Sequence, residues 1–304
     1  MKQLGLLVLF LIVAMFSTQP VLADDARAQE IIKEARVAIG GEELLQKIQG
    51  LNINGQYRRI LGEKELAGDR EISMLLPDKY LAEDAMNQGG LSTAMINSRG
   101  LNGEHAWMGS SGGGGGMIFR IGPGGKQASP EQMEAMLRRQ YQNEFRRYLL
   151  AILLLPPPSL TVDYKYAGES DVEDAHADVI EVTGPNKFAV RLFFDKQTHV
   201  PLLLSYRGLK PRIMMAFNRA GDKTMKPDEA LKKAQADAEK KMAEPGPKPE
   251  EVDFYIRLTD YKKVSGLLLP HKLTFLTESD VSEEFQISKY QLNPQFKADK
   301  FQKH

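Results

Sequence analysis

The sequence of 304 residues contains no cysteine, no excess of either charge, and no long apolar run after its first residues. The missing cysteine excludes a disulfide scaffold, thiolate metal sites, iron–sulfur clusters, thiol catalysis and a lipid-modified cysteine. The 40 basic and 40 acidic side chains cancel, whereas binding to nucleic acid phosphates depends on clustered Lys and Arg. We therefore expect no nucleic acid partner.

The remaining composition is that of a folded protein. Apolar residues make up 42% and charged residues 26% of the chain, which argues against general disorder. A chain of this length can bury a core without covalent or metal cross-links, as one large β-rich domain or as two smaller ones.

The first 23 residues resemble a secretory signal peptide. Lys2 provides a positive start, an apolar run follows from Leu4 to Phe16, and Val21 and Ala23 occupy the small-residue positions before a cleavage site. An anchoring helix is the alternative, but a run of about 13 residues is shorter than the roughly 20 that span a bilayer. We expect cleavage after Ala23 and export as a soluble periplasmic protein.

Hydrophobic periodicity predicts two helices before a long series of strands. Apolar residues at helical spacing predict helices over residues 28–39 and 42–49. From Leu51 onward the period changes to two, and short strands separated by turn residues follow one another, including one over Leu160–Ala167. We count ten to twelve strands, a pattern typical of an antiparallel meander.

The longest predicted helix covers Ser129–Leu155. Ser129 and Gln132 form a capping-box pattern, with Pro130 in the first turn. A broad apolar stripe follows, whereas four arginines lie mainly elsewhere on the helix: Arg138, Arg139, Arg146 and Arg147. The stripe fits core packing against a sheet and a lid over a lipid cavity equally well.

Two segments interrupt the strand pattern. Ser111–Gly125 is rich in glycine but fails the phosphate-binding P-loop pattern, because Gln127 follows Lys126 and Arg120 stands where the first glycine is needed. Residues 218–251 carry balanced charge and no aromatic side chain. We interpret the first segment as a flexible loop and the second as a charged helical excursion on the surface.

No motif for catalysis or metal binding is present in the sequence. No two of the five histidines fall within five residues of each other, and no serine lies in a G-x-S-x-G context. We therefore expect no enzyme activity, no cofactor and no metal site. A hydrolase whose carboxylates are brought together by folding is an alternative of low weight.

A strongly curved sheet with an amphipathic helix across it can enclose an acyl chain. Nine aromatic or aliphatic side chains of the strands and the long helix are candidate walls of such a cavity. They are Tyr57, Met136, Leu149, Ile152, Leu153, Leu192, Phe194, Ile256 and Phe275. A filled core explains the same side chains, and the sequence leaves both possibilities open.

Three groups of local strings resemble the bacterial lipoprotein-carrier superfamily with the LolA/LolB-like fold. The N-terminal group is Ala38–Gly41 with Leu44, Ile48 and Gly55; the middle group is Val190–Asp195 with Thr198 and Pro201-Leu202; the last is Asp260-Tyr261, Val264, Gly266, Leu269–His271, Tyr290–Pro294 and Phe301. Together these groups extend over most of the mature chain.

The resemblance implies a mainly β (α+β) fold, a strongly curved antiparallel half-barrel closed by helices over a hydrophobic cavity. It implies one domain over residues 24–304, with the excursion at 218–251, and non-catalytic carriage of a lipid or lipoprotein acyl chain in the periplasm. The alternative is a periplasmic sensor or adaptor that uses the same fold to dock a membrane protein partner. We expect a monomer.

Overall fold

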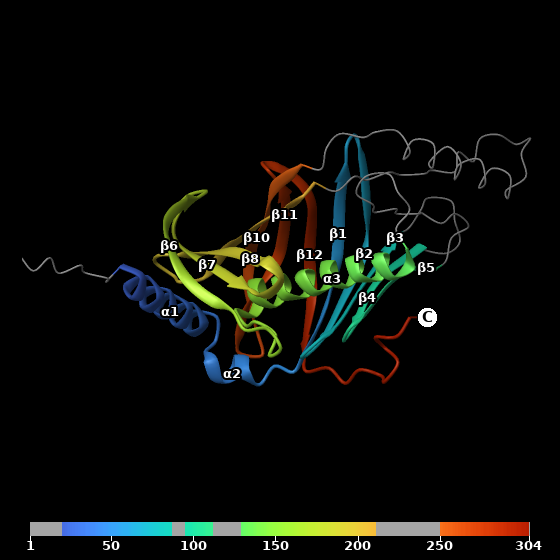
Figure 1. The fold of residues 1–304 in the computed structure, drawn as a ribbon, viewed down its shortest axis with the longest axis horizontal. Coiled ribbons are helices and arrows are strands. Elements are labelled where there is room, and N and C mark those ends of the chain that lie inside the picture. The colour runs from blue at the N-terminus through green and yellow to red at the C-terminus, as the bar shows by residue number, and fades with distance from the viewer. Residues whose placement is uncertain (1–19, 87–94, 112–128, 211–249, 304) are drawn as a thin grey trace, which may run out of the picture.

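The computed structural model describes residues 20–86, 95–111, 129–210 and 250–303 (Figure 1). Within these residues, twelve strands form one antiparallel sheet accompanied by three α-helices and one short 3-10 helix. The helices are α1 (Pro20–Ala38), α2 (Glu42–Gln46), α3 (Pro130–Leu153) and the 3-10 turn Pro185–Lys187. The strands are β1 (Gly50–Leu61), β2 (Lys64–Leu75), β3 (Lys79–Met86), β4 (Met95–Asn102), β5 (His105–Ser111), β6 (Asp163–Val172), β7 (Ala175–Gly184), β8 (Phe188–Asp195), β9 (Pro201–Leu209), β10 (Glu251–Val264), β11 (Leu267–Thr277) and β12 (Asp280–Leu292). The expected curved, mainly β half-barrel is confirmed.

The order of the strands explains the position of the long helix. The sheet runs β5-β4-β3-β2-β1-β12-β11-β10-β9-β8-β7-β6, so its two edges are β5 and β6. The chain connects these edges through α3, which crosses the concave face (Figure 1). Twelve strands would extend roughly 50 Å if flat, whereas α3 is about 36 Å long. Curvature of the sheet therefore lets one helix cover much of its width.

Bulges bend the strands. The pairing register shifts at four places, which lie in β1 with β12, in β11 with β12, in β6 with β7 and in β8 with β9. At the first of these, a Cβ atom on Gly55 would lie 2.1 Å from the carbonyl oxygen of Gln286. Only glycine fits where β12 approaches β1 this closely.

Hydrogen bonds fix both ends of α3, and those at its start were predicted from the sequence. The Ser129 hydroxyl accepts a hydrogen bond from the Gln132 backbone N–H, and the Gln132 side chain accepts one from the Ser129 N–H, which completes the predicted capping box. At the other end, the left-handed Leu154 ends the helix, and Arg36 of α1 donates two hydrogen bonds to its carbonyl oxygen. The helix is therefore tied to α1 at its C-terminus.

The N-terminal helix α1 covers the edge of the sheet formed by β6. The predicted apolar stripe of α1 is buried, including Ala28, Ile31 and Ile32, and the helix packs beside β6. The predicted cleavage point after Ala23 falls within α1, and residues 1–19 lie outside the described residues, so cleavage stays a prediction. Among the described helices, none has both the length and the apolar character required to cross a membrane.

Some sequence predictions need correction or lie outside the described part. The strand predicted at Leu160–Ala167 begins and ends later, at Asp163 and Val172, because its exposed polar end pairs with β7 in an edge hairpin. The glycine-rich loop after Ser111 and the charged excursion, apart from Glu250 and Glu251, are outside the described residues.

Candidate binding face

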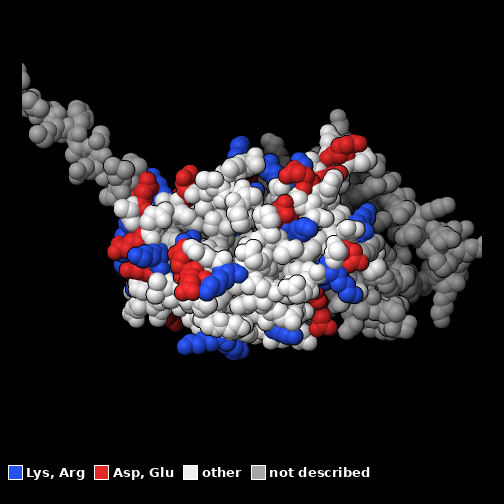
Figure 2. All heavy atoms as spheres, turned by 90° about the horizontal axis from the view of Figure 1, so that it is seen from below, with Lys and Arg blue, Asp and Glu red and all other residues white. Residues whose placement is uncertain are grey.

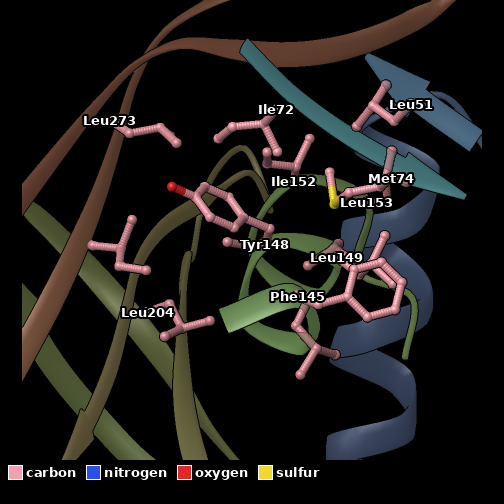
Figure 3. Close-up of a cluster of buried hydrophobic side chains, with 14 of the residues drawn as sticks. Leu51, Ile72, Met74, Phe145, Tyr148, Leu149, Ile152, Leu153, Leu204 and Leu273 are labelled. Carbon is pink, nitrogen blue, oxygen red and sulfur yellow. The ribbon is translucent and has the colours of Figure 1, made fainter. Parts of the chain in front are cut away.

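Alternation along the strands places an apolar surface on the concave side of the sheet, and α3 packs on it. Tyr148 and Ile152 of the helix point toward Ile72 and Leu273 of the sheet (Figure 3). The last two turns of α3 are buried on all sides, including Leu150 and Ala151, which lie outside the predicted stripe. The C-terminal half of the helix is thus embedded, whereas most of its first two turns are exposed or half-buried.

The structure brings most of the predicted wall residues together. One contiguous buried cluster contains Tyr57, Leu149, Ile152, Leu153, Leu192, Phe194 and Ile256. Phe275 is half-buried and packs against this cluster. Met136 is half-buried on the more exposed half of α3 and is not part of the cluster. Whether these side chains contact a ligand stays a prediction.

Beneath α3, the buried side chains of the helix pack against those of the sheet in one contiguous cluster. Two surface depressions lie away from this cluster, one around Arg207, Glu251 and Asp253 and the other beside Arg27 and Lys33 of α1. In this structure the side chains of α3 themselves occupy the concave face. An acyl chain in that place requires α3 to move relative to the sheet.

One flank of the concave face carries buried charges instead of apolar side chains. We call this the ion-pair cluster, which consists of Arg59, Arg70, Asp84, Arg99, Glu144 and Glu283. The Arg70 guanidinium lies at its centre, with Nε 2.6 Å and Nη2 2.9 Å from the two Asp84 carboxylate oxygens, and it also donates to Glu283. Arg99 bridges Asp84 at 3.1 Å and Glu144 of α3 at 3.4 Å. The three positive and three negative groups balance.

Mutual pairing controls the protonation of this cluster. Burial alone would raise the pKa of Asp84, but the charges of Arg99 and Arg70 outweigh it and hold that pKa below its ordinary value. Burial opposes the charges of Arg70 and Arg59 at Glu283 in the same way, and the pKa of Glu283 is also lowered. Both carboxylates are therefore ionised at neutral pH and neutralise the arginines around them.

Aromatic rings enclose the cluster. The Arg70 guanidinium carbon lies 4.6 Å from the centroid of the Tyr57 ring and 5.4 Å from that of Phe285. The Tyr57 hydroxyl is buried and has no hydrogen-bond partner among the described residues, and burial raises the pKa of Tyr57 to about 12. The Tyr80 hydroxyl, in contrast, donates to Glu144 at 2.7 Å.

The sequence analysis did not find the ion-pair cluster, although a signal was present. Arg70 lies on the same face of its strand as Ile72 and Met74, and Asp84 lies on the same face as Tyr80 and Ala82. Both charges therefore occupy positions that the period of two directs into the core. Charged residues at inward positions were therefore visible in the strands. Their pairing was not, because it depends on the register between β2, β3 and β12.

The opposite flank of the concave face holds a half-buried arginine, Arg147, whose Nε atom is buried. We call it the Arg147 site, formed by Arg146, Arg147, Phe188, Tyr206 and Phe254. The Arg147 guanidinium carbon lies 3.6 Å from the centroid of the Tyr206 ring, which stacks on Phe254 at 5.1 Å. Arg147 Nε is buried without a partner, and no carboxylate of the described residues forms an ion pair with this side chain.

Burial lowers the pKa of Arg147, because the desolvation of its charged form outweighs the opposing electrostatic effects of Tyr206 and Glu144. Arg146 lies beside it, with its guanidinium carbon 5.6 Å from the centroid of the Phe188 ring and with a hydrogen bond to Asn143. These two arginines, placed mainly outside the apolar stripe by the sequence analysis, therefore lie against aromatic rings of the sheet. An unpaired guanidinium among aromatic rings is an environment suited to an anion.

Other kinds of site find no support in the described part of the chain. No group of three or more His, Asp or Glu side chains there is arranged to hold a metal ion. The face in Figure 2 shows acidic and basic side chains interspersed, without a large patch of one sign. The concave face, with its two flanks, is the most distinctive feature available for binding.

Known proteins resemble this chain only distantly. A comparison with protein-family models and with curated protein sequences gives no match. Among solved structures, the chain is similar to a LolA superfamily protein from Nitrosomonas europaea, with 10% identity and a TM-score of 0.47 over 91% of this chain and 97% of the other. A DUF1329 family protein from Desulfovibrio piger is similar at 12% identity and a TM-score of 0.43, covering 94% and 98%. A domain assigned to outer membrane lipoprotein sorting in Vibrio parahaemolyticus is similar at 10% identity and a TM-score of 0.42, covering 91% and 97%.

Proposed function

We propose that this chain is a non-catalytic periplasmic binding protein that shields the acyl chain of a lipid or lipoprotein between α3 and the concave face of the sheet. The observation that carries the proposal is the construction of this face. A continuous apolar surface of one curved sheet is covered by a single helix that connects its two edges. Displacing that one helix exposes the apolar surface without breaking any pairing of strands.

The two halves of α3 are suited to such a movement. Its C-terminal half is embedded and tied to Arg36, whereas its N-terminal half is more exposed and contacts β5 through side-chain pairs at the surface. These pairs are Arg138 with Glu104 and His105 with Glu134. Exposed ion pairs contribute only about 0–1 kcal/mol each. The N-terminal half is therefore the end that we expect to lift.

A reversible cross-link tests this proposal. The native chain has no cysteine, so the double variant His105→Cys, Glu134→Cys places the only two thiols where the Nδ1 and Oε1 atoms lie 3.2 Å apart. A short reducible bis-thiol linker then holds α3 on β5. We expect uptake of phosphatidylcholine with a pyrene-labelled acyl chain to fall after cross-linking and to recover after reduction of the linker.

A matched control uses Glu43→Cys, Lys47→Cys near α2, where the native side chains pair at 2.6 Å and no movement is proposed. Cross-linking there should leave uptake unchanged. Equal uptake by the locked and unlocked His105/Glu134 variant would contradict binding beneath α3. Purified wild type that neither takes up the probe nor retains lipid in native mass spectrometry would contradict the function itself.

A further inference from the structure

The Arg147 site differs from the ion-pair cluster in what it lacks. Every arginine of the cluster has a carboxylate partner in the structure: Arg59 contacts Glu283 at 2.6 Å, Arg70 contacts Asp84 at 2.6 Å and Arg99 contacts Asp84 at 3.1 Å. Arg147 has an aromatic ring and no carboxylate among the described residues. A buried guanidinium without an anion is costly unless another group supplies one.

We infer that Arg147 binds the anionic headgroup of the amphiphile whose acyl chain the concave face shields. This inference rests on the proposed function, since it names the chemical class of the ligand for the same face. The guanidinium provides up to five N–H donors in a planar fork that matches a carboxylate or a phosphate. In this structure those donors make no hydrogen bond to the described residues.

The surroundings of Arg147 favour a headgroup attached to an apolar chain. Tyr206 holds the guanidinium plane from one side at 3.6 Å, which orients the donors while leaving its edge for an anion. Tyr206 and Phe254 form a stacked, half-buried pair, and the buried Phe188 continues the aromatic surface beneath Arg146. This surface joins the apolar cluster below α3. An amphiphile could therefore place its charged head at the Arg147 guanidinium and its apolar chain along the aromatic rings.

The surroundings of Arg147 also argue against a purely structural role for this side chain. A purely structural arginine on this helix would be expected to pair with a carboxylate, as Arg138 does with Glu104 at 2.8 Å. Glu144 lies one turn away on the same helix, but its carboxylate binds Tyr80 and Arg99 on the opposite flank. The helix therefore directs its acidic side chain to one flank and its unpaired basic side chain to the other.

A pair of ligands that share one acyl chain tests the inference. Oleate and methyl oleate differ in the charge of the head, and both are measured by displacement of the pyrene-labelled lipid at about pH 8, where the carboxyl group is ionised. We expect wild type to prefer oleate by about tenfold or more, because a charge-assisted hydrogen bond contributes about that factor. Arg147→Gln should remove the preference and leave the affinity for methyl oleate nearly unchanged, and Arg147→Lys should retain part of the preference.

Arg139→Gln is the matched control, since it removes the same charge from the same helix at an exposed position that takes part in neither flank. It should keep the preference of wild type. Equal affinity of wild type for the two ligands, or an unchanged preference in Arg147→Gln, overturns the inference while the proposed function stands. Acetate that competes as well as oleate overturns the assignment to an amphiphile. Wild type that binds neither oleate nor methyl oleate overturns the proposed function and this inference together.

Discussion

Arg70 is buried and Arg147 is half-buried on the same concave face, and the two arginines lie in different electrostatic surroundings. Arg70 contacts two carboxylates, from β3 and β12, and lies between two aromatic rings. Arg147 contacts one aromatic ring and has no carboxylate partner among the described residues. The first arrangement balances its charges within the protein and links neighbouring strands. The second has no carboxylate partner of its own among the described residues.

The comparison predicts its largest effect at Arg70. Arg70→Met removes the central positive charge and leaves Asp84 and Glu283 buried near each other without their shared partner. Breaking a buried pair in this way costs about 3–5 kcal/mol in the free energy of unfolding, measured from urea denaturation. The control Arg58→Met breaks pairs with Glu65 and Glu284 at an exposed position, where solvent screening should make the loss of stability much smaller. Similar losses for the two variants would show that the cluster is not electrostatically special.

Acid should weaken the ion-pair cluster next. The pKa values of Asp84 and Glu283 are lowered in the folded protein, so the unfolded chain binds protons at these groups at a pH where the folded chain does not. Their contribution is complete above the ordinary carboxyl pKa of about 4 and is lost as the pH falls through the folded values. We expect the urea concentration at the unfolding midpoint to decrease as the pH is lowered below about 5. The decrease should be shallower in Asp84→Asn. Equal slopes for wild type and variant would contradict this assignment.

Leu153→Trp probes the apolar region between the two flanks. Leu153 is fully buried in the cluster of α3 and the sheet, so a larger side chain should overpack it and cost about 1–3 kcal/mol. The matched control is Leu209→Trp, because Leu209 on β9 is 55% exposed. A melting temperature that is unchanged in Leu153→Trp, together with reduced lipid occupancy, would instead indicate that the protein in solution keeps an open cavity at this position.

These regions differ in how far the sequence predicts them. The period of two identified the sheet and the inward position of Leu192, Phe194 and Ile256, because alternation is a local property. The capping box at Ser129 fixed the start of α3 for the same reason. The partners of Arg70 lie 14 and 213 residues away along the chain, so only the register of the assembled sheet reveals them.

The neighbours of Arg147 in the sheet were not predicted, for a related reason. Its position on the helix follows from the sequence, but which strands flank α3 depends on the crossing from edge β5 to edge β6. That crossing brings Tyr206 under the guanidinium. The sequence pattern separated apolar from charged positions on the helix, and the structure shows that a charged position can still face the sheet.

Arg147→Met gives the sharpest contrast with Arg70→Met. Because no carboxylate is left unpaired, loss of the charge removes a desolvation cost together with a cation–π contact of about 0.5–2 kcal/mol. We expect the free energy of unfolding to change by about 1 kcal/mol or less in either direction, measured in urea without lipid. A loss comparable to that of Arg70→Met would indicate a structural role for Arg147 and would remove the distinction between the two flanks.

The smallest effect is expected at Tyr57, beside Arg70. Its hydroxyl is buried without a partner, so Tyr57→Phe removes an unsatisfied group and should change the free energy of unfolding by about 1 kcal/mol or less, with stabilisation as the favoured sign. Tyr80→Phe is the matched control, because it deletes the hydroxyl that donates to Glu144 at 2.7 Å and should cost about 1.5–3 kcal/mol.

An alkaline titration gives Tyr57→Phe a second readout. Burial raises the pKa of Tyr57 to about 12, whereas the unfolded residue ionises near pH 10. Between these values the folded protein holds a proton that the unfolded chain has lost, so stability falls as the pH rises. Tyr57→Phe should make that fall shallower than in wild type. If the stability of Tyr57→Phe decreases as much as that of Tyr80→Phe, or if the slope is unchanged, the Tyr57 hydroxyl has a hydrogen-bond partner in solution. The surroundings of Arg70 would then differ from those compared with the Arg147 site above.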